Sequence, residues 1–171
     1  QKDLGNEHED VATSLFTLAV FYSRDGDVDA AIKYATDALK VQRANENVKD
    51  AARSLHFLAD LYLHQKEYKQ ALEHYAKAMN HETNHFGYYC DATAKTLNCI
   101  GTAKLMQNDF REAMESHEEA LRILKECHGE DLKHPLVSET LCHIGSVYYR
   151  ERNSHGAMSS TNDDYTTFIE G

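Results

Sequence analysis

Proline and glycine are scarce in this sequence, which contains one proline, Pro135, and eight glycines in 171 residues. Both residues disfavour helix interiors, and the helix formers Ala, Leu, Glu and Lys are common, so a nearly all-helical chain is predicted. Long apolar runs are also missing, because the longest nearly apolar stretch, "LFTLAVFY", is too short to span a bilayer. No basic and then apolar leader opens the chain. We therefore expect a cytoplasmic protein with no membrane partner.

Positive charge is in deficit, with 18 Lys and Arg against 28 Asp and Glu and a formal net charge of −10 at pH 7. A field of this sign repels phosphate backbones and anionic lipid surfaces. We therefore expect no nucleic-acid partner.

Cysteine is sparse, and the four cysteines include no Cys-x-x-Cys pair: Cys90, Cys99, Cys127 and Cys142. Three of them lie in apolar helical patterns, as small buried hydrophobic residues do, which favours a reducing compartment. The length suits one domain or an array of small units. Because the chain begins with Gln1 rather than Met, we expect a segment of a longer protein.

Four segments of the sequence align with one another. Their leading leucines are spaced 40, 42 and 44 residues apart: Leu15, Leu55, Leu97 and Leu141. Three residues after each leucine comes an apolar residue, and a small residue follows it directly, as in Leu58-Ala59 and Ile100-Gly101. The apolar positions predict the buried stripe of a first helix, and the small residue lets a second helix approach closely.

A short polar turn and a second helix follow in each segment. Gly26 and Asn108 stand in two of these turns, where they suit a left-handed helix end. The second helix carries alanine at two equivalent places: Ala31, Ala71, Ala113 and Ala157, then Ala38, Ala78 and Ala120.

The pattern Leu-x-x-Leu-Ala-x-x-Tyr, turn, x-x-Ala, then Ala-Leu resembles the tetratricopeptide repeat. This resemblance implies an all-α superhelix, or solenoid, of four antiparallel helix-turn-helix units forming a single domain over residues 1–171. The units are expected at 9–46, 48–86, 90–128 and 134–171. The usual unit has about 34 residues, and the extra residues here fall between units, as in "RANENVKDAAR" and "HETNHFGYYCDATAK".

Two junctions between units also match, namely "LGNEHEDVATSL" and "GEDLKHPLVSETL". The second, with its His134-Pro135 pair, resembles the longer repeat of kinesin light chains and related scaffolds, although Glu9 stands where the first junction would have proline. Proline at a first helical turn gives up no intrahelical hydrogen bond. Pro135 is therefore interpreted as the start of a helix.

The eleven histidines raise the question of a metal site. His81 and His85 lie four residues apart with Cys90 nearby, but the segment is interpreted as a polar linker and no second ligand pair completes a set of four. A ligand pair of His128 and His134 is disfavoured even more, because the repeat alignment already accounts for His134 and its proline. We therefore expect no metal and no cofactor.

Catalytic motifs are missing too, because the sequence has no Ser-His-Asp order and no Gly-rich phosphate loop. We expect a non-enzymatic scaffold that binds a protein or peptide partner, such as a cargo, motor or complex subunit, in the concave groove of the superhelix. The alternative is a structural self-association module that forms a homo-oligomer.

The concave wall is expected to carry the residues one and five places after each leading leucine, with the residue two places before it at the rim. These positions are Phe16, Val20, Arg53, His56, Asp60, Lys95, Asn98, Thr102, Glu139, Cys142 and Ser146. Asn98 is the strongest candidate, because an amide pairs with both N–H and C=O of a bound backbone. Arg53 and Lys95 follow, as cations in an acidic protein.

A clamp for two carboxylates, such as some tetratricopeptide co-chaperones use, is disfavoured because Phe16 and Val20 stand where that clamp needs Lys and Asn. At the chain end, residues 154–171 contain many weak helix formers. We expect a degenerate or capping second helix there, and a loose docking peptide is the alternative.

Overall fold

The computed structural model describes the backbone of residues 2–129 and 134–166, and the side chains within 9–129 and 134–154. Seven helices occur in this part of the chain: α1 (Lys2–Asp25), α2 (Val28–Ala44), α3 (Val48–His64), α4 (Tyr68–Phe86), α5 (Asp91–Met106), α6 (Phe110–His128) and α7 (Pro135–Thr166). The described residues contain no strand, so the predicted all-α class is confirmed.

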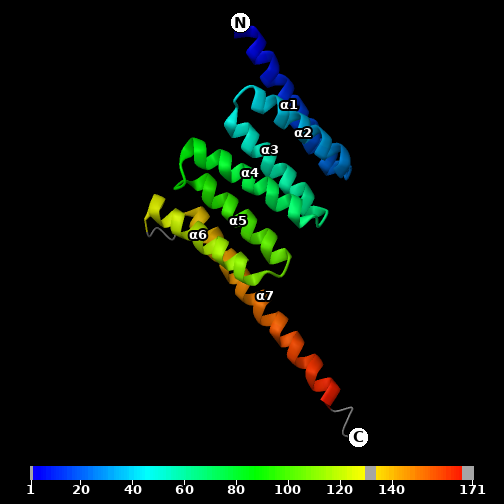
Figure 1. The fold of residues 1–171 in the computed structure, drawn as a ribbon, viewed down its shortest axis with the longest axis vertical. Helices are drawn as coiled ribbons and strands as arrows, with labels where there is room; N and C mark the ends of the chain where they lie inside the picture. The colour runs from blue at the N-terminus through cyan, green and yellow to red at the C-terminus, as the bar shows by residue number, and fades with distance from the viewer. Residues whose placement is uncertain (1, 130–133, 167–171) are drawn as a thin grey trace.

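Successive helices pair into antiparallel hairpins that stack along the long axis of the molecule (Figure 1). α1 pairs with α2, α3 with α4 and α5 with α6, while α2 packs on α3 and α4 packs on α5. α7 lies against α6 and touches α5. This arrangement is the predicted solenoid of helix-turn-helix repeats.

The turns inside the hairpins depend on a left-handed residue that ends each first helix. Gly26 (φ +88°) and Asn108 (φ +63°) adopt this conformation, as predicted, and Lys66 (φ +62°) adopts it in the second hairpin. After the first turn, Asp27 is the N-cap of α2, and its side chain accepts a hydrogen bond from the backbone N–H of Ala30 at 3.0 Å.

Alanines fill the crossing points between the helices. In α2, α4 and α6 the alanines at both predicted places are fully buried, as are two on the first helices: Ala31, Ala71, Ala113, Ala38, Ala78, Ala120, Ala19 and Ala59. The side chain of Ala157 lies outside the described residues. A single methyl group at each crossing lets the backbones approach closely. Buried apolar clusters therefore lie along the whole length of the three hairpins.

The leading leucines differ according to their place in the stack. Leu55 and Leu97 are buried between neighbouring hairpins, whereas Leu15 is half-buried and Leu141 is 40% exposed. Leu18 is also exposed, because α1 has no preceding described helix against its outer face.

The extra residues of each unit are mostly helical, which corrects the prediction that they form linkers. "RANENVKDAAR" holds only the turn Asn45–Asn47, and "HETNHFGYYCDATAK" holds the four-residue connection 87–90. α4 continues through His81 and His85 until Gly87, where φ of +86° ends it. Long second helices therefore account for much of the added length.

The fourth unit differs most from the prediction, because α7 is one continuous helix through the expected turn. Arg152 stands where the earlier turns have Gly26, Lys66 and Asn108, and it stays helical. Asp164 replaces the buried alanine of the second helices, and burial of a carboxylate against a helix would be costly. The hairpin therefore does not form within the described backbone, and the side chains expected to make the cap or docking peptide lie outside the described residues.

No helix in the described ranges combines the length and the apolar character needed to cross a membrane.

Gly101 and Gly145 make a matched pair for testing the close-packing argument. A methyl group on Gly101 would lie 2.6 Å from the ring of His117, whereas one on Gly145 would meet nothing within 4 Å. We expect Gly101→Ala to destabilise the fold by about 1–3 kcal/mol, because the buried ring has little room to move. Gly145→Ala should stabilise it by about 0.5–1 kcal/mol through helix propensity. Urea unfolding followed by circular dichroism measures both, and equal effects of the two variants would contradict the assignment.

Candidate functional site

A groove of about 870 Å³ runs over the inner faces of the middle helices. α3 and α5 supply most of its lining residues. α4 and α7 contribute the others. Its lining residues are Lys49, Ala52, Arg53, His56, Asp60, Leu63, Tyr75, Glu82, Phe86, Asp91, Ala92, Lys95, Asn98, Cys99, Thr102, Glu139 and His143. The groove therefore joins three successive repeat units.

Seven of the predicted wall residues line this groove, all from the second, third and fourth units: Arg53, His56, Asp60, Lys95, Asn98, Thr102 and Glu139. The other four do not line it. Phe16 packs edge-on against Phe57 at 5.3 Å, and the Arg53 guanidinium lies 4.4 Å from the Phe16 ring centre. Cys142 and Ser146 are exposed on α7, and Val20 is half-buried on α1.

Sequence reasoning missed a further turn of this wall. Lys49 and Asp91 stand four residues before the rim positions Arg53 and Lys95, so continuing the helical spacing toward each N-terminus would have found them. On α7 the groove residue is His143 rather than Cys142. Tyr75 and Glu82 come from the second helix α4, where no repeat position indicates a wall residue.

Three polar side chains hold the middle of the groove in place. Glu82 is buried, and its Oε1 lies 3.1 Å from Nε2 of His56. The Thr96 hydroxyl donates to Glu82 Oε2 at 2.6 Å and lies 2.9 Å from the same His56 nitrogen. Since the hydroxyl hydrogen points to Glu82, the His56 Nε2–H is the donor toward both oxygens. The imidazole is therefore fixed rather than free to turn toward a ligand.

Two titratable groups at the groove floor, the Tyr75 hydroxyl and the Cys99 thiol, are kept protonated. Tyr75 donates its hydroxyl hydrogen to Asp60, and burial together with this carboxylate raises the pKa of Tyr75. Burial, followed by the charges of Asp60 and Glu139, raises the pKa of the Cys99 thiol to about 12. A thiol in this state is a poor nucleophile at neutral pH.

Asn98 has a structural role that the sequence did not indicate. Its Nδ2 donates to the Thr140 hydroxyl at 2.7 Å, and its Oδ1 accepts from Nδ1 of His117 at 3.0 Å. Thr140 in turn donates to the Leu136 carbonyl at 2.7 Å. The amide thus ties α5 to α6 and α7. One N–H and one lone pair remain for a ligand, so its expected pairing with a bound backbone stays a prediction.

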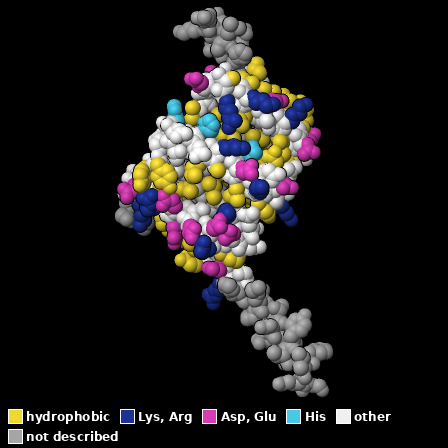
Figure 2. Space-filling model, in the orientation of Figure 1, with side chains coloured by type: hydrophobic (Ala, Val, Ile, Leu, Met, Phe, Trp, Pro, Cys, Tyr) yellow, Lys and Arg dark blue, Asp and Glu magenta, His cyan; other side chains and the backbone are white. Residues whose placement is uncertain are grey.

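Charges of both signs surround the groove. Lys49, Arg53 and Lys95 lie on the wall with the carboxylates of Asp60 and Glu139. On the face seen in Figure 2, acidic and basic side chains are mixed, with hydrophobic side chains exposed between them. Such a surface suits a ligand with an apolar part and charges of both signs.

Two family models match the chain, and both are described as tetratricopeptide repeat: one over residues 50–126 and one over residues 12–45. The chain belongs to the tetratricopeptide repeat family. No curated protein matches the sequence at a significant level. The tetratricopeptide repeat fold is in general a non-catalytic scaffold for protein–protein interaction.

Solved structures of similar fold include BtubC (BKLC) from P. vanneervenii, with 21% identity, a TM-score of 0.71, and coverage of 94% of this chain and 65% of BtubC. A Rap protein complexed with Competence and Sporulation Factor has 18% identity and a TM-score of 0.67, covering 95% of this chain and 43% of its own. The N-terminal domain of stress-induced protein-1 from C. elegans has 18% identity and a TM-score of 0.60, covering 80% of this chain and 96% of its own. This chain therefore spans less than two thirds of BtubC and of the Rap protein.

Among the described histidines of this tetratricopeptide repeat domain, His117 has a clearly lowered pKa. It is fully buried, stacks on His143 at 5.1 Å, and lies against Gly101. Because Asn98 Nδ2 is committed to Thr140, the hydrogen of the pair with Asn98 belongs to His117 Nδ1. Burial, and then His143, lower the pKa of His117 from 6.5 to about 4. The ring is therefore neutral in the folded protein at pH 7.

This lowered pKa predicts acid sensitivity. The unfolded chain takes up the proton first as the pH falls, so folding loses stability progressively between pH 6.5 and about 4. The loss attributable to this ring is at most about 3 kcal/mol. We expect His117→Gln to flatten that part of the pH profile of the unfolding free energy. Urea titrations from pH 7 to 4 test this, with exposed His64→Gln as the control. Parallel profiles for wild type and His117→Gln would count against the assignment.

Proposed function

We propose that this domain is a non-enzymatic scaffold that binds an extended segment of a partner protein in the groove formed by α3, α5 and α7. The observation that carries the proposal is a groove of about 870 Å³ that crosses three repeat units. Grooves of this kind accept a peptide several residues long, whereas a small substrate site would be more enclosed.

The lining residues suggest the chemistry of the segment. Apolar atoms of Ala52, Leu63, Phe86 and Ala92 lie among the lining residues and suit one apolar anchor. Lys49 and Lys95 are exposed cations at the wall and suit acidic residues beside the anchor. Asp60, exposed further along α3, suits a basic residue or an N–H donor. An apolar residue flanked by acidic residues is therefore the proposed recognition element.

The junction at His134-Pro135 supports a finer proposal, namely cargo or adaptor binding similar to that of kinesin light chain repeats. The Rap protein solved with Competence and Sporulation Factor supports the general idea that this fold holds a partner. Its identity to this chain is 18%, so it supports no particular ligand. We also propose a cytoplasmic location, with which the four free cysteines agree.

Charge reversal at the groove tests the peptide proposal. Fluorescent peptides with an apolar residue between acidic residues should bind the wild type, and Lys49→Glu with Lys95→Glu should weaken binding roughly 10-fold, because two attractions become repulsions. Lys69→Glu with Lys77→Glu is the matched control, since both lysines are exposed and neither lines the groove. Fluorescence anisotropy at several salt concentrations gives the affinities.

The two double variants change the net charge equally, so a general electrostatic effect would weaken both. If every peptide binds both variants as tightly as wild type, the groove is not the binding site. If peptides with basic flanks bind best to wild type, the proposed chemistry of the ligand is wrong.

Self-association is a second candidate function, which the exposed apolar side chains at the two ends of the described stack favour. α1 exposes Val11, Leu18 and Phe21, and α7 exposes Leu141, Tyr148 and Tyr149. Phe21 and Tyr149 are 61% and 69% exposed. In the middle of the stack the equivalent helix faces are covered by neighbouring hairpins, so a second copy stacked end to end would cover these faces in the same way.

Light scattering over a concentration series tests this candidate. Head-to-tail stacking predicts a molar mass that rises with concentration, and Leu18→Glu with Phe21→Glu should abolish the rise because charge would be buried at the contact. Glu substitutions at the exposed positions Lys69 and Lys77 serve as the control. A monomeric mass for wild type at every concentration would eliminate the candidate.

A further inference from the structure

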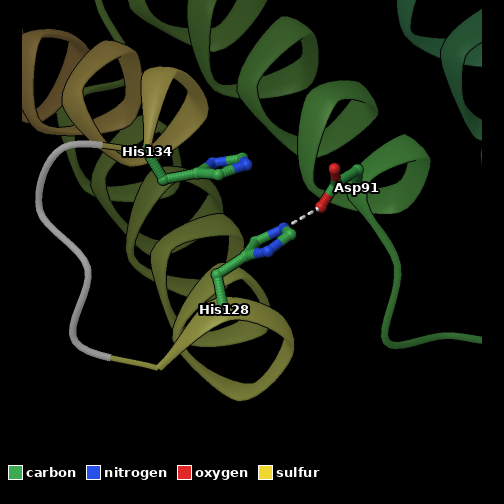
Figure 3. A group of neighbouring side chains, drawn as sticks. All are labelled: Asp91, His128 and His134. Atoms are coloured by element: carbon green, nitrogen blue, oxygen red, sulfur yellow. Dashed lines mark hydrogen bonds and ion pairs between the residues drawn. The ribbon is translucent and has the colours of Figure 1, made fainter.

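Asp91, His128 and His134 converge at the joint between the third and fourth repeat units (Figure 3). Asp91 is the first residue of α5, His128 is the last residue of α6, and His134 directly precedes α7. One potential ligand atom from each of the three lies within 4.8 Å of the others. Figure 3 shows the two imidazoles, one above the other, both directed toward the carboxylate of Asp91.

We propose that this joint is a binding site for a transition metal ion such as Zn²⁺, held by the two imidazoles and the carboxylate. The set contains His128 and His134, which the repeat alignment disfavoured as a ligand pair, and it does not contain His81, His85 or Cys90. His81 and His85 lie in the last turns of α4, and among the described residues their side chains form no converging group with Cys90. Spacing along the chain could not reveal the new set, because its members come from three helices.

The contacts within the cluster leave ligand positions unused. His128 Nε2 lies 2.5 Å from Asp91 Oδ1, so this pair is joined by one hydrogen bond. The His134 ring is stacked on the His128 ring, with centres 3.8 Å apart and planes inclined by 16°. Nδ1 of His134 is buried and has no hydrogen-bond partner among the described residues. A buried nitrogen of this kind is costly unless a donor or a metal ion meets it.

The charges of the cluster also suit a bound cation, because it combines one carboxylate with two imidazoles. A divalent ion binds imidazoles in their neutral form and keeps the carboxylate as an anionic ligand. The arrangement of charges therefore suits one ion shared by three residues.

The donor set selects the class of ion. Two imidazole nitrogens and one carboxylate oxygen are ligands typical of Zn²⁺ and its neighbours Co²⁺ and Ni²⁺. Ca²⁺ requires six or more oxygens and Mg²⁺ a nearly octahedral oxygen shell, neither of which is provided here. Tetrahedral Zn²⁺ places its ligand atoms about 3.3 Å apart. The ligand atoms, which now lie within 4.8 Å of one another, would therefore have to move closer when the ion binds.

An ion at this place would act on the fold by fastening α7 to α5 and α6. Described contacts at the start of α7 include the Asn98–Thr140 hydrogen bond and the packing of Leu136 and Val137. α7 also carries Glu139 and His143 of the groove, so the ion would fix the position of that end of the groove. This inference does not depend on peptide binding.

Calorimetric titration of the metal-free full chain with ZnCl₂ tests the site. We expect one ion bound per chain, a higher midpoint of thermal unfolding when Zn²⁺ is present, and no competition from excess Mg²⁺. Asp91→Asn and His134→Ala should each lower the Zn²⁺ affinity at least about 100-fold, because loss even of an outer partner of a ligand costs 10- to 100-fold. Asp91→Asn keeps the size of the side chain and covers the case in which His134→Ala disturbs the joint.

The double variant His81→Gln with His85→Gln is the matched control, because it removes two histidines of α4 that do not belong to the cluster. It should bind Zn²⁺ as tightly as wild type. Co²⁺ in place of Zn²⁺ should give the visible absorption of a tetrahedral site in wild type and in the control, and lose it in Asp91→Asn. The proposal is overturned if wild type binds no ion, if Asp91→Asn and His134→Ala bind as tightly as wild type, or if the control loses the affinity.

Discussion

The stack depends on close approach of helices at positions whose side chains are a methyl group or a hydrogen atom. Ala19 and Ala59 are fully buried on the first helices, and Gly101 takes the same place in the third unit, where the ring of His117 fills the space. Larger residues at these crossings would separate the helices and open the core. In α7 the equivalent residue, Gly145, meets no neighbour, because no second helix folds back onto it. The same residue type therefore marks both a formed hairpin and an unformed one.

Close packing also determines which polar residues are available at the groove. Asn98 stands at a wall position, but its amide is used to join α5 with His117 on α6 and Thr140 on α7. His56 is likewise fixed by Glu82 and Thr96. Buried polar groups must be paired, and residues on an inner helix face find partners in the neighbouring hairpin before any ligand arrives. The side chains left for recognition are those at the rim, chiefly Lys49, Lys95 and Asp60.

Features repeated along the chain could be predicted from the sequence, and features of its ends and joints could not. The alanine positions, the left-handed Gly26 and Asn108, and the tetratricopeptide repeat itself follow from a helical period that recurs unit after unit. The residues that the wall rule selects on α3 and α5, which have neighbouring helices on both sides, line the groove. Phe16 on α1 and Cys142 on α7 do not line it, and there one neighbour is missing from the described stack. Contacts such as Tyr75 with Asp60 join different helices, and no spacing along the sequence indicates them.

The joint of the third and fourth units has one feature that the repeat pattern predicts and others that it does not. Pro135 begins α7, as the repeat pattern predicts, and this position fixes where His134 must lie at the end of the preceding connection. The long α6, which continues to His128, brings a second imidazole to the same level, and α5 begins there with Asp91. His134, which the repeat pattern explains only as the residue before Pro135, thus meets two other side chains because of where the helices begin and end. Lengthening the repeat beyond the usual unit therefore does more than add helical turns, because it aligns three helix ends and gives their polar side chains a common meeting point.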